Sequence, residues 1–435
     1  MIRISTGMIF DQGVKAINSQ TAQLLHVQQQ VANNRRILTP ADDPVGAARA
    51  LVVNQSVDVA AQFASNQDNA KSALGLEEGH LMGVTELMGH LKELAVRAGN
   101  GGLTNADRRT IATELRARFD ELMGIANAAD GNGEFIFGGY MSRTKPFGAS
   151  ADAYIQNAAA TEAGLYSGDD GQRRLQVSPT RFLEVSDAGN DVFMRIKNGN
   201  GYFATNYAAG NTGSGIIDMG SVTNPQAWNG AATKNVDIKF TVTAGVTTYD
   251  IVDAASGDSL LTGGPGPAPV ASQRTFQSGQ PIVLSQVGPP TFDLGASVTI
   301  TGTPASNDTF TLAPSTNQSL FRTLAGLIGT LEAGTSGSAS SAKYAIDLGN
   351  AIGNLDRAND NILRVRAAIG SRLSEVDSLA SVNEDLQLQY QQTLSNIQDL
   401  DYAKAISDLT RKQTDLEAAQ KSFLRTSQLS LFNYL

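Results

Sequence analysis

The sequence predicts an elongated α+β fold, in which long helices from the two chain ends form a coiled-coil bundle and the middle supplies inserted β-rich domains. Three observations support this fold class. Both ends carry apolar residues at alternating three- and four-residue steps, the spacing of a helical seam. The middle alternates apolar and polar residues, as strands do. The 43 glycines and the 6% aromatic content are typical of closely packed helices and turn-rich strands.

The first helix is predicted over residues 10–31. Its seam steps by four and three residues in turn, as a heptad repeat does, and consists of Phe10, Val14, Ile17, Thr21, Leu24, Gln28 and Val31. Two of these seam residues are polar, so the helix on its own is expected to be marginally stable in water. The segment therefore needs a helical partner.

A second, long helix is predicted from about Pro44 to Ala98. The pair Asp42-Asp43 stands directly before Pro44, which suits an N-cap followed by the first helical position. After a glycine turn, Thr104 and Asp107 have the spacing of a capping box and predict a third helix to about Ala129. Glycines within the second helix either interrupt it or admit a neighbouring helix at close range, namely Gly75, Gly79, Gly83 and Gly89.

The middle of the chain is predicted to be β structure. A strand is expected over residues 134–140, with the sequence Glu-Phe-Ile-Phe-Gly-Gly-Tyr. Beyond it, apolar and polar residues alternate in short runs such as 236–242, and clusters rich in glycine and proline separate the runs. Two separate β-rich bodies are therefore expected.

Helix is predicted to return near Asn317 and to continue, after a Gly/Ser break at 334–341, almost to the last residue. The chain ends on an apolar cluster, which is expected to be buried against a partner. Residues 1–38 hold four basic side chains and one acidic one, a net charge of +3, whereas residues 371–435 hold six basic and nine acidic ones, a net charge of −3. These opposite signs favour pairing of the two ends.

The elements predict four regions. Residues 1–43 and 400–435 form a terminal coiled-coil layer, and residues 44–145 with 316–399 form a helical bundle layer that includes a short β-hairpin. Residues 146–235 form an outer β-rich domain, and residues 236–315 form an inserted β module. An assembly interface is expected on the terminal layer, although the same stripes could be intramolecular core; its residues are Phe10, Val14, Ile17, Leu24, Val31, Ile406, Leu409, Leu416, Phe423, Leu429, Leu431 and Phe432.

Composition argues against several classes of function. The net charge of −9 is unlike the basic surface of a nucleic-acid-binding protein. Because the chain has no cysteine, disulfides, thiolate catalysis and Cys-ligated metals are excluded. The sequence contains no run of about 18 apolar residues, so no membrane span is predicted. Residues 1–20 lack a Sec-type signal. No grouping of nucleophile, base and orienting residue predicts an enzyme, and no cofactor is expected.

Two patterns that resemble binding sites have simpler interpretations. His26, His80 and His90 lack the four-residue spacing of paired metal ligands, so we expect structural or solvated histidines and no metal site. Residues 199–204 match a dinucleotide-binding fingerprint, but a loop rather than a helix follows them. A β-turn is the better interpretation.

The acidic clusters are also expected to be structural. Asp42-Asp43 before Pro44 predicts a helix cap and not a catalytic carboxylate pair. Asp399 and Asp401 are expected to mark a break between two helical layers. Residues 130–134 and 187–191 lack the glycine and the closing glutamate of a calcium loop, so tight turns are expected there.

Several motifs resemble those of a known family. Residues 1–8, Met-Ile-Arg-Ile-Ser-Thr-Gly-Met, resemble the start of the flagellar hook-associated proteins that join hook to filament. Residues 34–45 resemble a motif that these proteins share with flagellin, and residues 135–139, 395–403 and 429–435 also match. The chain is thus similar to the flagellin-like hook-associated family, with the specific motifs in about residues 1–150 and 340–435.

The resemblance implies a structural subunit of the bacterial flagellum, exported unfolded through the flagellar type III apparatus with an export chaperone at its C-terminal helix. The implied partners are the preceding hook-associated protein, flagellin and identical subunits in a ring, and the implied location is the extracellular flagellum. The two ends would be disordered in the free subunit and form the inner coiled coil in the ring. Two other functions stay open: a flagellin filament subunit, and a secreted surface-binding protein or adhesin that uses the β domains.

Overall fold

The computed structural model describes residues 6–156 and 165–428, and its secondary structure confirms the α+β class. The chain forms two compact units. Unit 1 consists of the chain up to Asp68, of Gln176–Thr180 and of the chain from Val376, and unit 2 consists of Asn69–Leu175 and Arg181–Glu375. The predicted layers, which divide at residues 43 and 400, do not coincide with these units. The reason is that the continuous helices α2 (Pro44–Ala98) and α7 (Ser338–Gln398) contribute to both.

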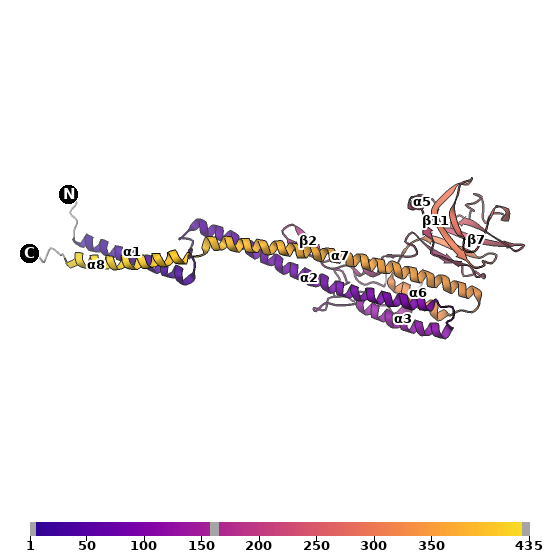
Figure 1. Cartoon of the computed structure of the whole chain (residues 1–435), viewed down its shortest axis with the longest axis horizontal. Helices are drawn as coiled ribbons and strands as arrows, with labels where there is room; N and C mark the ends of the chain where they lie inside the picture. Colours follow the sequence, from indigo (N-terminus) through magenta and orange to yellow (C-terminus); the bar gives the residue numbers. More distant parts are fainter. Residues whose placement is uncertain (1–5, 157–164, 429–435) are drawn as a thin grey trace, which may run out of the picture. The chain divides into compact units, whose positions relative to one another are not determined.

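Unit 1 is mainly helical. α1 (Thr6–Asn33) and α8 (Tyr402–Gln428) pack along each other, which confirms that the chain ends are helical and pair (Figure 1). α2 begins at Pro44 as predicted, because the Asp43 carboxylate accepts a hydrogen bond from the Gly46 N–H at 2.8 Å and caps the helix. Residues 399–401 separate α7 from α8, and Asp401 caps α8 by accepting a hydrogen bond from the Lys404 N–H at 3.1 Å.

The implied disorder of the free ends differs from this structure. Residues 6–33 and 402–428 of the single chain are already helices in mutual contact. The soft heptad pattern understates the contact because it does not register a glycine that lets the two helices approach closely, as described below.

Three further helices of unit 2 surround an aromatic core: α3 (Asn105–Ala126), α4 (Ala151–Gln156) and α6 (Leu320–Ala333). The capping box of α3 is present as predicted, with the Thr104 hydroxyl accepting from the Asp107 N–H at 3.2 Å and the Asp107 carboxylate accepting from the Thr104 N–H at 2.9 Å. α3 ends at Ala126, earlier than predicted. Phe321 of α6 lies at the centre of the core, with ring centroids 5.0–5.9 Å from those of Phe119, Phe147, Tyr154 and Phe193.

The glycines of α2 neither break the helix nor admit a close neighbour within this chain. An added Cβ would meet no atom within 4 Å at Gly75, Gly79 or Gly89. At Gly83 it would meet only Ile125, at 3.8 Å. Within this chain these glycines therefore have no close neighbour, and the approach of a helix from another subunit stays a prediction.

The predicted strand over residues 134–140 is also wrong. These residues form turns, and Phe135 makes only an isolated bridge to Ala129, because Gly133 and Gly139 turn the chain at φ values of +78° and +69°. Residues 130–134 form the predicted turn, in which Asp130 accepts hydrogen bonds from two main-chain N–H groups. Residues 187–191 instead lead into a π-helical turn, η2 (Asn190–Met194).

The β-rich part lies in unit 2 and forms two main sheets. The five-stranded sheet has the order β4-β12-β7-β8-β9, and the other sheet has the order β10-β11-β5 with β6 paired to β11. We call these nine strands the β module: β4 (Phe203–Tyr207), β5 (Ile216–Ile217), β6 (Ser221–Val222), β7 (Val236–Thr243), β8 (Val246–Asp253), β9 (Arg274–Thr275), β10 (Pro281–Gln286), β11 (Phe292–Thr301) and β12 (Thr309–Pro314). The remaining short elements are β1 (Arg174–Ser178), β2 (Arg181–Glu184), β3 (Ile196–Lys197), α5 (Pro225–Gly230), η3 (Val270–Ser272) and β13 (Asn317–Gln318).

The predicted division into two β bodies at residue 235 is wrong, because strands from both sides of it share the sheets. β4 pairs with β12, and β5 and β6 pair with β11. One hydrophobic core joins Phe203 and Trp228 from the first range to Phe240, Ile282 and Val298 from the second. The local alternation of residues predicts strands but not which distant strands pair.

Candidate assembly surface

The helices α1 and α8, which we call the terminal pair, meet at one aromatic contact. The ring centroids of Phe10 and Phe423 lie 5.1 Å apart, with an angle of 51° between the ring planes. Gly13 lies beside this contact, and a Cβ at that position would be 2.5 Å from Cδ2 of Phe423. A side chain on residue 13 would therefore displace the Phe423 ring from its present position.

The predicted seam residues come together along the terminal pair but remain partly in water. Phe10 is 52% exposed and Ile406 is 45% exposed. The other described apolar residues predicted for the assembly interface are half-buried: Val14, Ile17, Leu24, Val31, Leu409, Leu416 and Phe423. Among the described side chains of the two helices, Ala405 alone is buried. Leu429, Leu431 and Phe432 lie outside the described residues.

Additional large apolar side chains of the terminal pair are more exposed than the seam. Leu25 is 53% exposed on α1, and Leu424 is 58% exposed on α8. Single exposed apolar residues are common on proteins, but a helix pair with almost no buried side chain is not a complete core. The described surface of the pair thus offers apolar area for a further partner.

Between residues 6–33 and 402–428, the opposite net charges of the ends produce no ion pair. Lys412 Nζ donates a hydrogen bond to Gln23 Oε1 at 2.6 Å across the pair. Within residues 6–33 and 402–428 the ion pairs of α8 are local to that helix, as between Arg411 and Asp408 at 3.1 Å, and none joins α8 to α1. Apolar packing and this hydrogen bond therefore connect the two helices.

The connection between α1 and α2 is tied to the end of α7 by Arg36. Its main-chain N–H donates to Gln398 O at 2.7 Å, and its Nη2 donates to Ile397 O at 2.6 Å. A cation at the C-terminal end of a helix satisfies free carbonyls and complements the helix dipole. The same guanidinium lies 3.3 Å from the Asp43 carboxylate, so one arginine connects the start of α2 to the end of α7.

Asp42 and Asp43 are structural, as predicted. Asp42 accepts hydrogen bonds from the Thr39 N–H at 2.8 Å and the Leu38 N–H at 3.0 Å, and it contacts His26 Nε2 at 2.9 Å. These contacts, with the Thr39 bond the strongest, lower the pKa of Asp42. The bond from the Gly46 N–H is the main cause that lowers the pKa of Asp43. Both carboxylates are therefore ionised caps of a turn and a helix.

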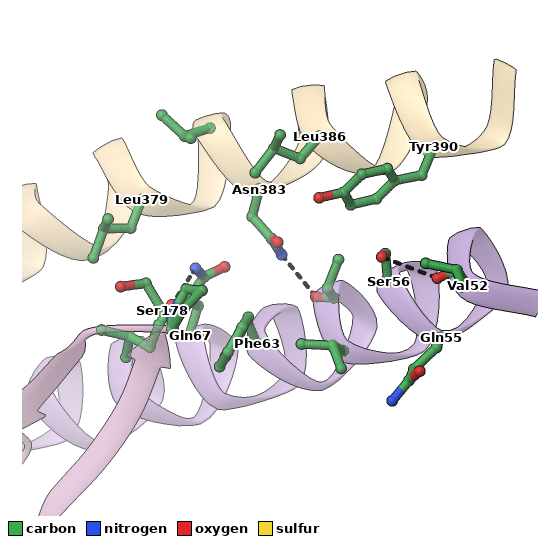
Figure 2. Close-up of a pocket in the computed structure, with 15 residues that line it drawn as sticks. Val52, Gln55, Ser56, Phe63, Gln67, Ser178, Leu379, Asn383, Leu386 and Tyr390 are labelled. Carbon is green, nitrogen blue, oxygen red and sulfur yellow. Dashed lines mark hydrogen bonds between the residues drawn. The ribbon is translucent and has the colours of Figure 1, made fainter. Parts of the chain in front are cut away.

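A second apolar surface of unit 1 is a groove of about 350 Å³ between α2, α7 and residues 177–179. Figure 2 shows Leu379, Leu386 and Tyr390 of α7 facing α2 across this groove. Asn383 spans it, because its Nδ2 donates to the Ala60 carbonyl at 2.8 Å. Val52 on its wall is 64% exposed.

Among the described residues, these surfaces hold neither a metal-binding cluster nor a membrane-spanning helix. Within residues 6–156 and 165–428, no group of three or more histidine, aspartate or glutamate side chains is placed to hold a metal ion. None of the helices in the described parts of the chain combines the length and the apolar character that a bilayer crossing needs. Residues 199–202 form the expected turn, with Gly199 at φ +61° and Gly201 at φ +91°, and β4 begins at Phe203.

Sequence reasoning found the seam but missed Gly13, Arg36 and the groove. Gly13 stands next to a seam position, and a glycine there signals close approach of a neighbour. Arg36 lies in the motif at residues 34–45 that resembles flagellin, but nothing in the sequence around it predicts that it contacts α7. The groove arises from segments more than 300 residues apart, which no local pattern could join.

Comparisons with known proteins agree with the two helical ends. Residues 4–142 match the family model described as the bacterial flagellin N-terminal helical region. The chain is 26% identical to flagellar hook-associated protein 3 of Escherichia coli over 431 residues, which is 99% of both chains. It is similar to the crystal structure of the flagellar junction protein FlgL from Legionella pneumophila, with a TM-score of 0.68, 28% identity and coverage of 82% of this chain and 100% of that one. Xanthomonas campestris FlgL gives a TM-score of 0.65 at 27% identity, with coverage of 79% and 99%.

Proposed function

Because this chain belongs to the flagellin-like hook-associated proteins of the bacterial flagellum, we propose that it is a structural subunit of the junction between hook and filament. In this role it binds the preceding hook-associated protein on one side and flagellin on the other. Identical subunits lie beside it in a ring. The terminal pair forms the inner part of that ring.

The observation that carries the proposal is the incomplete burial of the terminal pair. Phe10 and Ile406 keep 52% and 45% of their surface in water in the single chain. Burial of apolar surface contributes about 25 cal/mol per Å², so a neighbouring helix pair that covers these residues stabilises the assembly. Many weak seams buried together can make a stable tube.

Two different apolar surfaces on unit 1 suit a subunit with different neighbours. The terminal pair offers one, and the groove between α2 and α7 offers the other. Head-to-tail contacts need two distinct complementary surfaces, and they build rings or helical arrays. We infer that the groove contacts a neighbouring flagellar subunit and not a small molecule.

Export to the extracellular flagellum is part of the proposal. The chain has no cysteine, so no disulfide has to form or break when it passes unfolded through the type III apparatus. The apolar face of α8, with Leu424 58% exposed, suits an export chaperone that keeps this helix from self-association before export. We expect the chaperone and the ring neighbours to compete for this face.

The proposal is tested by deleting the gene and restoring it with variants. The deletion should leave bare hooks and release flagellin into the medium. Ile406→Ser replaces a half-exposed seam residue and should restore filaments poorly, whereas Val287→Ser, at a loop position 96% exposed on the β module, should restore them fully. Filaments that attach normally after the deletion would refute the assignment, and loss of all filament protein from the medium would favour a flagellin.

A further inference from the structure

Arg274 joins the open edges of the two sheets of the β module. β9 is the last strand of the five-stranded sheet, and β10 is the last strand of the other sheet. Arg274 belongs to β9, where it pairs with Tyr249 of β8. Its Nη1 donates to the Val283 carbonyl at 3.1 Å, and its Nη2 donates to the Ser285 carbonyl at 2.7 Å. One guanidinium therefore spans two carbonyls of β10.

The side of β10 that faces away from β11 is formed by Pro281, Val283 and Ser285. Alternate residues of an antiparallel strand direct both main-chain groups to the same side. Pro281 has no N–H, so it suits the side away from the ladder. The Val283 and Ser285 carbonyls lie on the same side, since both accept hydrogen bonds from Arg274. Between these two residues the pairing of β10 with β11 shifts register, and Val283 is 50% exposed. An open edge of this kind is a template for pairing with another strand.

The chemistry of arginine suits the closure of this edge. Its planar guanidinium holds several donors in fixed positions and can bond two acceptors at once, whereas a lysine ammonium is a single point of charge. Arg274 is the only arginine in residues 198–318, a stretch that contains the whole β module. Arg274 lies opposite the buried Tyr249 in the β8–β9 pairing. Burial raises the pKa of Tyr249, and the positive charge of Arg274 opposes this shift.

We propose that Arg274 closes the β10 edge and so prevents β10 from pairing with the β10 strand of a second copy of this chain. Two identical strands can pair antiparallel about a two-fold axis, because such a contact is self-complementary. Without Arg274, the outward N–H and C=O groups of Val283 and Ser285 would be free for that ladder. An assembly that holds many copies side by side needs such protection against wrong pairing.

The test compares the full-length chain with matched variants at equal concentrations. Arg274→Ala removes both hydrogen bonds to β10, and Arg274→Lys keeps the charge without the double contact. Adding Val283→Pro to Arg274→Ala removes the central outward N–H that a second β10 would need. Lys239→Ala, on β7, is the control for loss of one positive charge. Sedimentation velocity over a hundredfold range of concentration measures self-association.

Arg274→Ala should associate at least tenfold more tightly than the wild-type chain, and Arg274→Lys should lie between the two. Lys239→Ala and the double variant should behave like the wild type. Association of Arg274→Ala equal to wild type, or association that Val283→Pro leaves unchanged, would overturn the proposal. Fluorescence of Trp228, buried in the module core, shows whether the module is folded. If Arg274→Ala unfolds the module, the association of Arg274→Lys is compared with that of the wild-type chain instead. Tighter association of Arg274→Lys supports the proposal, and equal association overturns it.

Discussion

The stability of unit 2 is expected to depend on pH, because Glu77 is buried within it. The side chain is fully buried on α2, and its Oε1 accepts a hydrogen bond from the Asp187 N–H at 3.1 Å. Oε2 is buried and has no hydrogen-bond partner in the described part of the chain. Burial, followed by the nearby Asp187 carboxylate, raises the pKa of Glu77 to about 8, although Arg372 and Arg173 oppose the shift. The folded chain therefore holds this proton at neutral pH.

The size of the effect follows from the two pKa values. The unfolded chain releases the proton near pH 4.5 and the folded chain near pH 8. Between these values the folded state binds more protons, so the free energy of unfolding falls as the pH rises. Each pH unit removes about 1.4 kcal/mol. Glu77→Gln abolishes the titration and keeps an acceptor for Asp187, so its advantage over wild type should grow from near zero at pH 4.5 to roughly 3 kcal/mol at pH 7.

The assay is urea unfolding followed by circular dichroism at pH values from 5 to 9, extrapolated to water. Glu78→Gln is the matched control, because the Glu78 carboxylate accepts hydrogen bonds from Arg366 at 2.6 and 2.9 Å. Removing that charge should lower the stability rather than raise it. If wild type and Glu77→Gln lose stability in parallel as the pH rises, the assignment of a buried, protonated Glu77 is wrong.

Other substitutions test the terminal pair and its connection to α2. Gly13→Ala places a methyl group against Phe423 and should speed amide hydrogen exchange over residues 6–33, whereas Gly75→Ala meets no neighbouring atom and should stabilise α2 by about 0.5–1 kcal/mol in urea unfolding. Equal rates of amide hydrogen exchange over residues 6–33 in the two variants would contradict the close approach at residue 13. Phe10→Ala removes the ring contact and should raise exchange in α8, with unit 2 unaffected. Arg36→Ala removes the bonds to the α7 carbonyls and should speed exchange at the end of α7; unchanged exchange there would show that Arg36 does not secure it.

The helices were predictable because their signals are local. The seam at three- and four-residue steps, the Asp43 cap and the Thr104 capping box each act within a few residues, and the structure confirms them. The β module was predicted as strands but divided wrongly. β4 and β12 are about 100 residues apart in sequence, and their pairing depends on shared burial that no short window contains.

The assembly surface was predicted only in part. The seam marks which side chains face a partner, but a repeat pattern cannot tell partial from full burial in one chain. That distinction came from the 52% exposure of Phe10 beside the close contact at Gly13. The ends were expected to be disordered in the free subunit, but residues 6–33 and 402–428 form paired helices. The polar residues in the repeat suggested weak pairing, and they gave no sign of the close contact that Gly13 permits.

Chemical labelling of a single cysteine tests the central claim most directly, since the natural chain has none. Ile406→Cys reports on the terminal pair, and Val287→Cys reports on an exposed loop of the β module. Rapid labelling of residue 406 in the purified subunit and strong protection of it in intact flagella, with residue 287 reactive in both, is the predicted result. Labelling of residue 406 at the same rate in both states would contradict the proposal that assembly completes the burial of the terminal helices.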